Sequence, residues 1–201
     1  MAIAIDGTGT ITGISVGGLN DSIITSSELA NGAVTAAKLA AGAGGKILQV
    51  QSHSTTTRSS EALASNSAGT TKWLTVNITP SSTSSKIIIF YNLSGSIDYS
   101  YYGTILRRGT TPINVGTSAG SRAATTTFLY TDPTSTVRMG NHTSCFVDSP
   151  GVTTQLDYNV IVHNSNNGSL TFYANSTVDD TNDATLRNRT ASSIIVAEYL
   201  P

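Results

Sequence analysis

Alternation of apolar and polar residues is the strongest constraint on how this 201-residue chain folds. A period of two residues is typical of a β-strand with one buried face. The residues placed on one face in this way are Leu74, Val76 and Ile78 in KWLTVNIT, and Leu156, Tyr158, Val160 and Val162 in TTQLDYNVIVH. No window shows sustained helical periodicity, so the sequence predicts an all-β fold.

Two further segments, KIIIFYNL and SSIIVAEYL, are apolar without alternation. Such runs suit strands covered on both sides, either inside a sandwich or at a subunit contact. Turn-forming clusters such as TPSSTSS, RRGTTP and NSNNGS separate the expected strands. Residues 46–201 are therefore predicted to form an antiparallel β-sandwich of jelly-roll type, a head domain with Trp73 in its core or at a subunit interface.

Residues 1–45 differ in composition, with single apolar residues among Gly, Ala, Ser and Thr, and they contain a ten-residue repeat. Residues 24–33 and 34–43 share a β-branched residue, Thr, two small residues, a charge, Leu, Ala, any residue, Gly and Ala. Each unit offers too little apolar surface for a core of its own and is too short for an isolated helix. The simplest way to bury the apolar residues of this segment is to pack it against the same segment of other copies of the chain. The alternative is that the segment is a flexible linker. The candidate contacts between chains are Ile24, Glu28, Leu29, Val34, Lys38 and Leu39.

The cluster GAGGK that ends this arm is not a phosphate-binding loop. A Walker A motif requires a glycine five residues before Gly45 and a hydroxyl residue after Lys46, but Ala40 and Ile47 stand there. The cluster is interpreted as a hinge between arm and head.

Composition excludes several classes of function. The net charge is −1 and only 11% of residues are charged, which argues against a nucleic-acid binder. The single cysteine, Cys145, leaves no intramolecular disulfide. The N-terminus lacks a basic leader and no stretch is long enough to cross a membrane, so we expect assembly in a cytoplasm, without membrane insertion.

The segments GTGTITGISVGGL and ELANGAVTAAKLAAGAGGKILQV resemble the N-terminal region of tail-fibre and other virion structural proteins of tailed bacteriophages, marine ones especially. The W..V.ITPSSTSSKIII opening and the terminal SSIIVAEYLP are similar to the C-terminal heads of such fibres, which tend to be trimeric jelly rolls like C1q and TNF. The head has no collagen-like stalk, so the C1q comparison concerns architecture only. The resemblance implies a homotrimeric virion appendage.

Catalytic and metal motifs are incomplete. GTSAG matches G-x-S-x-G around Ser118, but no helix is expected after it, and a loop turn is preferred over an esterase or depolymerase site. His142 and Cys145 fall on opposite faces of a strand and do not converge on a metal. DDTND, residues 179–183, is interpreted as an Asx-type turn, with calcium as the alternative. We expect no enzyme activity and no cofactor.

The segment SIDYSYYGTILRRG is the candidate for ligand binding, because tyrosines beside charges can stack on sugar rings and hydrogen-bond to their hydroxyl groups. The candidate glycan contacts are Tyr99, Tyr101, Tyr102 and Arg107. The alternative places these tyrosines in the core or at a trimer contact.

The sequence therefore predicts a trimeric phage structural protein located in the virion. Its arm attaches to other virion proteins, such as capsid, portal, tail or fibre adaptor, and its head binds host-surface polysaccharide. The alternative is a capsid decoration or cement protein that stabilises the shell without binding a receptor.

Overall fold

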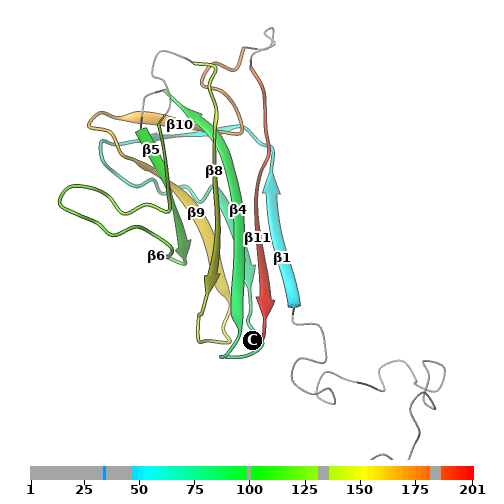
Figure 1. The fold of residues 1–201 in the computed structure, drawn as a ribbon. Coiled ribbons are helices and arrows are strands. Elements are labelled where there is room, and N and C mark those ends of the chain that lie inside the picture. Colours follow the sequence, from blue (N-terminus) through cyan, green and yellow to red (C-terminus); the bar gives the residue numbers. More distant parts are fainter. Residues whose placement is uncertain (1–33, 35–46, 99–100, 131–135, 182–186) are drawn as a thin grey trace, which may run out of the picture. The chain divides into compact units, whose positions relative to one another are not determined.

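The computed structural model describes residues 34, 47–98, 101–130, 136–181 and 187–201 (Figure 1). The chain divides into two units, Met1–Gly44 and Gly45–Pro201. Within the first unit only Val34 is described, and its side chain is exposed. The other candidate arm contacts, Ile24, Glu28, Leu29, Lys38 and Leu39, lie outside the described residues, as does the predicted hinge.

The second unit contains two antiparallel β-sheets (Figure 1). Sheet A has the order β1-β11-β4-β10-β2. β8 pairs with β4 along the edge opposite to the one that pairs with β11. Its strands are β1 (Ile47–Thr55), β2 (Ser59–Leu63), β4 (Lys86–Ile97), β8 (Gly140–Asp148), β10 (Leu170–Ala174) and β11 (Ser192–Tyr199).

Sheet B has the order β3-β9-β5-β6, and β7 also pairs with β5. Its strands are β3 (Leu74–Ile78), β5 (Tyr101–Arg108), β6 (Thr111–Pro112), β7 (Thr127–Tyr130) and β9 (Leu156–Asn164). β6 and β7 occupy successive stretches of the edge of β5 that β9 leaves free.

The predicted all-β fold with antiparallel sheets in a sandwich-like arrangement is confirmed. The described residues include no helix, and therefore none that is long and apolar enough to span a membrane. The expected alternation appears in β3, where Leu74, Val76 and Ile78 are buried while Thr75 and Asn77 are exposed.

Apolar side chains from both sheets meet in one core between them. Trp73 packs edge-on against Phe172 with a centroid distance of 4.9 Å, so of the two places predicted for it, the core or a subunit interface, it lies in the core. The largest fully buried apolar side chains are Tyr102, Tyr158, Phe172, Leu74, Ile87, Ile89, Leu93, Leu106 and Ile194. Burial of this many large side chains supplies the main stabilisation of a fold without disulfides.

The apolar face predicted for β9 packs on the core, and the second faces of β9 and β4 differ in coverage. β9 alternates in sequence, yet its second face, which carries Asn159, Ile161 and His163, is also buried. Polar side chains tolerate this burial because they find partners: Asn159 Nδ2 donates to the carbonyl of Gly109 at 2.9 Å. The apolar run in β4, conversely, is not covered on both sides within the described chain, because Phe90 remains 50% exposed; cover at a subunit contact, the other setting expected for this run, stays a prediction.

The buried carboxylate of Glu198, near the end of β11, forms hydrogen bonds with β1 and with the turn between β3 and β4. Glu198 is 0% exposed and accepts hydrogen bonds from the backbone N–H of Ser81 at 2.7 Å, from the hydroxyls of Ser81 and Ser85, and from Gln49 Nε2. Burial alone would raise the pKa of Glu198, but these donors outweigh it and lower the pKa to about 2. The TPSSTSS turn is therefore held by an ionised side chain.

Candidate functional site

Three aromatic side chains, Tyr101, Phe128 and Tyr130, form an exposed group on sheet B, called here the aromatic cluster. Tyr101 lies opposite Tyr130 in the β5–β7 pairing, and Phe128 lies opposite Gly103. Since residues two apart in a strand share a face, all three rings project from the same side of the sheet. They are 42%, 57% and 56% exposed for Tyr101, Phe128 and Tyr130, respectively.

The rings of the cluster are in contact with one another. Tyr101 stacks on Phe128 with centroids 6.0 Å apart and planes 18° apart, and it meets Tyr130 at 5.0 Å. Exposed apolar surface that is concentrated in one place, rather than scattered singly, marks an interaction site. The cluster therefore offers a preformed apolar platform to a ligand.

A buried hydrogen-bond chain holds the strand that carries two of these rings. The hydroxyl of Tyr91 contacts that of Thr104 at 2.7 Å, Thr104 contacts Thr127 at 2.6 Å, and Thr127 contacts His142 Nδ1 at 2.6 Å. Burial lowers the pKa of His142 to about 4, so its ring is neutral at pH 7. These hydrogen bonds connect Thr127 of β7 to β5 in sheet B and to β4 and β8 in sheet A. They hold in place the strand that carries Phe128 and Tyr130.

The loop between β6 and β7 crosses β5 at Gly103. The N–H of Thr126 donates to the carbonyl of Thr104 at 2.7 Å, and the Thr126 hydroxyl accepts from the N–H of Leu106 at 2.8 Å. A Cβ at Gly103 would lie 2.6 Å from the carbonyl oxygen of Thr127, so only glycine allows this close approach. Gly103 thus sets the path of the loop that borders the cluster.

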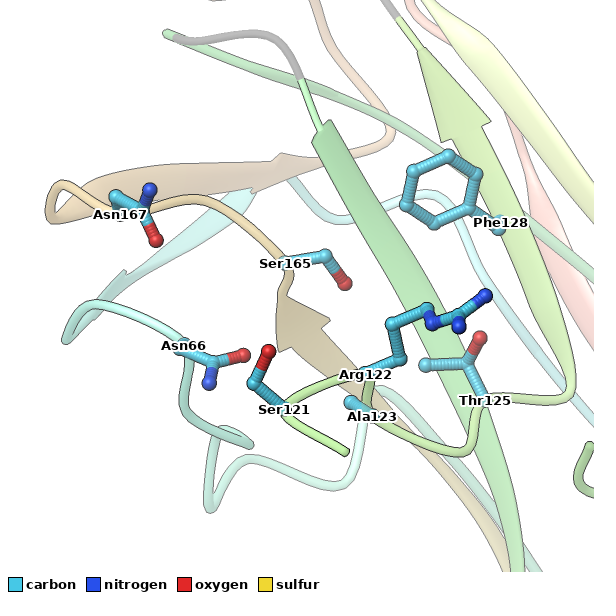
Figure 2. A pocket seen from close by; sticks show the side chains of 8 residues that line it. All are labelled: Asn66, Ser121, Arg122, Ala123, Thr125, Phe128, Ser165 and Asn167. Atoms are coloured by element: carbon cyan, nitrogen blue, oxygen red, sulfur yellow. The ribbon is translucent and has the colours of Figure 1, made fainter. Parts of the chain in front are cut away.

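A pocket of about 520 Å³ adjoins the cluster and shares Phe128 with it (Figure 2). Three loops and β7 supply its lining: Asn66, Ser121, Arg122, Ala123, Thr125, Phe128, Ser165 and Asn167. In Figure 2, Phe128, Arg122 and Thr125 occupy one side of the view, and Asn66 and Asn167 occupy the other. The pocket therefore combines one aromatic wall with amide, hydroxyl and guanidinium groups.

Asn164 and backbone hydrogen bonds hold two of the pocket's loops. The Nδ2 of Asn164 donates to the carbonyls of Ala64 and Gly168, both at 2.8 Å, and the N–H of Asn66 donates to the carbonyl of Asn166 at 2.9 Å. Asn66 has a φ of 46°, a left-handed value that asparagine adopts more readily than most residues. The two loops that present Asn66 and Asn167 are thus anchored by the Asn164 side chain and by a main-chain hydrogen bond.

Several polar side chains in the pocket have no partner within the described part of the chain. They are Asn66, Ser121, Arg122 and Asn167, and all four are exposed. Their donors and acceptors remain available to a ligand, whereas Ser165 shares its hydroxyl with His163 Nδ1 at 3.1 Å. The site thus has the composition of a small-ligand site: an apolar wall and a few orienting polar groups.

Of the sequence-predicted ligand contacts, the structure places only Tyr101 at this site. Tyr99 lies outside the described residues. Tyr102 is a correction: it is 0% exposed, its hydroxyl donates to the carbonyl of Gly95 at 3.2 Å, and it belongs to the core. Neighbouring strand residues face opposite sides, so Tyr101 and Tyr102 cannot both be exposed when one face packs on the core.

Arg107 is a second correction. It lies six residues from Tyr101 along the same strand, a distance of about 20 Å, and its Nε donates to Asn159 Oδ1 at 2.9 Å. Tyr101 and Arg107 therefore do not belong to one binding site. Arg107 instead donates a hydrogen bond to the buried side chain of Asn159.

Sequence reasoning missed Phe128, Tyr130, Arg122 and the asparagines of the pocket. TFLY is only four residues long, and its pairing with β5 joins residues far apart in sequence. The alternation of Phe128 and Tyr130 around Leu129, directly after a turn-rich stretch, is the one local signal that could have pointed to them.

The other motifs agree with their non-catalytic interpretations. Ser118 is exposed in the loop between β6 and β7, as predicted for a loop turn. His142 is buried while Cys145 is exposed, so they face opposite sides of β8 as expected. No group of three metal-binding side chains occurs among the described residues.

Asp179 to Thr181, the described part of DDTND, form an Asx-type turn, since the N–H of Thr181 donates to Asp179 Oδ1 at 3.1 Å; the rest of the motif lies outside the described residues. The Thr181 hydroxyl also donates to Asp179, and arginines pair with both carboxylates: Asp179 with Arg187 at 2.6 Å, and Asp180 with Arg189 at 2.5 Å and Arg58 at 3.2 Å. Hydrogen bonds from Thr181 and Arg187 lower the pKa of Asp179 to about 2.

A second exposed surface lies on the outer side of sheet A and is called here the apolar face. Strand pairing aligns its residues in two rows: Val147, Ile88, Ala197 and Val50, then Cys145, Phe90, Ile195 and Ser52. Neither row contains a charged side chain, and Val50, Phe90, Val147 and Ile195 are each at least 41% exposed. This surface lies on the opposite sheet from the aromatic cluster.

A search of protein-family models finds no match to the chain, and a search of curated protein sequences finds none either.

Proposed function

We propose that this protein is a homotrimeric structural component of a tailed-bacteriophage virion, a fibre-like appendage whose head binds glycans on the host surface. The observation that carries the binding function is the aromatic cluster at the border of a polar pocket. The resemblance of the arm and of the terminal strands to phage fibre proteins supports the virion location. The arm attaches the trimer to capsid, portal, tail or fibre-adaptor proteins.

The chemistry of the cluster suits a sugar ring. The face of an aromatic ring carries partial negative charge and attracts the polarised C–H groups on the face of a pyranose. The hydroxyl groups around that pyranose need hydrogen-bond partners, and Asn66, Ser121 and Asn167 offer free amide and hydroxyl groups beside Phe128. A ligand that is apolar on one face and polar at its rim fits this arrangement better than a wholly apolar one.

The strand order supports a jelly-roll head. Consecutive strands cross between the two sheets from β2 to β5 and again from β7 to β10, as strands do in Greek-key sandwiches, whereas β1 and β2, β5 to β7, and β10 and β11 stay within one sheet. The resemblance to C1q-like and TNF-like heads leads to the same assignment.

The apolar face supports self-association. Its two uncharged rows can meet another copy of the chain without desolvating a charge, and exposed apolar surface of this kind marks a contact surface. Covering Phe90 and Ile195 would also explain why β4 and β11 are apolar without alternation. Three heads on one trimer then give avidity from weak single sites.

Binding of the full-length protein to a saccharide array tests the glycan function. Wild type is expected to bind at least one saccharide, and Phe128→Ala to lose about tenfold in affinity because the stacking wall is gone. Val152→Ala is the control, since Val152 is an exposed apolar residue that belongs neither to the aromatic cluster, nor to the pocket, nor to the apolar face. Equal binding by wild type and Phe128→Ala would contradict the proposal.

Electron microscopy of the particle tests the place of the protein. Density for trimers at the tail supports host attachment. Density spread over the capsid shell, together with a protein that binds no saccharide, would contradict host attachment and identify a decoration protein.

A further inference from the structure

We propose that the pocket beside the aromatic cluster selects acidic saccharides, whose carboxylate or sulfate group pairs with Arg122. This inference rests on the proposed glycan-binding function and names the class of sugar that the same site prefers. It is carried by the position of Arg122 in the pocket and by the absence of a partner for its guanidinium among the described residues.

Arg122 differs from every other described lysine and arginine. Five of these cations form ion pairs with carboxylates: Arg58, Lys72, Arg108, Arg187 and Arg189. Lys86 donates to Ser149 at 2.7 Å, Arg107 donates to Asn159, and Arg138 also has a partner. An arginine that has no partner among the described residues and lies at the border of a pocket is available for an external anion.

The surroundings of Arg122 favour an anion over a cation. The described lining contains no aspartate or glutamate, so nothing in it competes for the guanidinium. A guanidinium presents parallel N–H donors that match the two oxygens of a carboxylate or the oxygens of a sulfate. The neighbouring groups, Ser121, Thr125 and Asn66, are neutral and can accept or donate hydrogen bonds to the ring hydroxyls.

The aromatic wall distinguishes an acidic sugar from a simple anion. Phe128 lines the same pocket as Arg122, and Figure 2 shows both on one side of the view. A ligand that engages both groups must carry an apolar ring face next to its charge. A uronic acid or a sulfated pyranose meets this requirement, and a free inorganic anion does not.

Backbone hydrogen bonds hold the turn that carries Arg122. Its backbone N–H donates to the carbonyl of Ala119 at 3.2 Å and closes a tight turn in which Gly120 has a φ of 62°. Two further contacts hold the loop: the N–H of Gly116 donates to the carbonyl of Thr125 at 3.1 Å, and Thr126 is bonded to β5. Arg122 is therefore carried by an ordered turn beside the pocket.

Titration of the full-length protein with matched methyl glycosides, followed by NMR at low salt, tests the inference. The probes are methyl glucoside, methyl glucuronide and methyl glucoside 6-sulfate, the same three in the galactose series, and sodium acetate as a carboxylate without a ring. Wild type is expected to bind at least one acidic glycoside about three- to fivefold more tightly than its neutral counterpart, as one partly exposed ion pair allows. Raising the salt concentration should reduce that preference.

Arg122→Gln should bind acidic and neutral glycosides equally, at the neutral affinity of wild type, while Lys86→Gln removes the same charge on the other sheet and should keep the preference. If neutral glycosides bind but wild type shows no acidic preference, or Arg122→Gln retains it, the inference fails and the glycan function stands. Acetate binding as tightly as the glucuronide overturns the inference as well. If no glycoside binds, the inference and the glycan function fail together.

Discussion

His142 makes the stability of the head depend on pH, and the size of the effect follows from its surroundings. The ring is 2% exposed and Tyr102 meets it edge-on at 4.5 Å; among the described residues only its Nδ1 has a hydrogen-bond partner, the hydroxyl of Thr127. Burial lowers its pKa from the ordinary value of 6.5 to about 4. Protonation therefore requires a charge to enter the core beneath the aromatic cluster.

The sign follows from proton binding in the two states. Between pH 6.5 and pH 4 the unfolded chain binds a proton at His142 and the folded chain does not, so stability is fully present above pH 6.5 and falls as the pH drops. Two pKa values of 6.5 and 4 give a loss of about 2 kcal/mol between pH 7 and pH 5. The pKa of His163 is also lowered by burial, and this adds a loss in the same direction.

Urea unfolding of wild type and His142→Gln at pH 7, 6 and 5 measures the contribution of His142 to the pH dependence of the unfolding free energy. The variant is expected to be less stable at pH 7, yet to lose about 2 kcal/mol less than wild type between pH 7 and pH 5. Comparing the two slopes cancels His163 and the carboxylates, which both proteins share. Parallel slopes would refute the reasoning, because they would mean that His142 titrates alike in the folded and unfolded states.

Three further predictions follow from the same structure. Phe90→Asp should shift the protein from trimer to monomer in sedimentation experiments while leaving the affinity of a single head for a saccharide unchanged, and a persistent trimer would contradict the role given to the apolar face. Glu198→Gln should lower the free energy of unfolding by about 1–3 kcal/mol at pH 7, because Ser81 and Ser85 lose an ionised acceptor, and a smaller change would show that their hydroxyls find other partners. Gly103→Ala should lower the unfolding free energy and weaken saccharide binding together, because the loop that crosses β5 must move; binding at full wild-type strength would show that this loop does not position the site.

Local patterns predicted the core better than they predicted the surface. Alternation identified the buried face of β3, because burial on one side leaves a signal of period two in consecutive residues. It identified the apolar face of β9 but did not predict that the second face is buried as well, since the partners of Asn159 there, Arg107 and Gly109, lie about 50 residues earlier in the chain. The runs in β4 and β11 indicated cover on both sides, and the single chain supplies cover on only one.

The candidate site was predicted only in part because it is assembled from distant segments. Tyr101 could be identified from its own neighbourhood, a tyrosine-rich stretch before a strand. Its partners on β7 and the pocket residues Asn66, Arg122 and Asn167 lie in other segments that only the pairing of β5 with β7 and β9 brings near. Arg107 shows the converse error, since closeness in sequence along an extended strand becomes a long distance in space.

NMR of the aromatic side chains during a saccharide titration tests the central claim most directly. The account predicts that a bound saccharide shifts the ring signals of Tyr101, Phe128 and Tyr130, while those of the buried Tyr102 and Tyr158 stay in place. Saccharide-dependent shifts confined to residues away from these three rings, or no shifts with any saccharide tested, would contradict it.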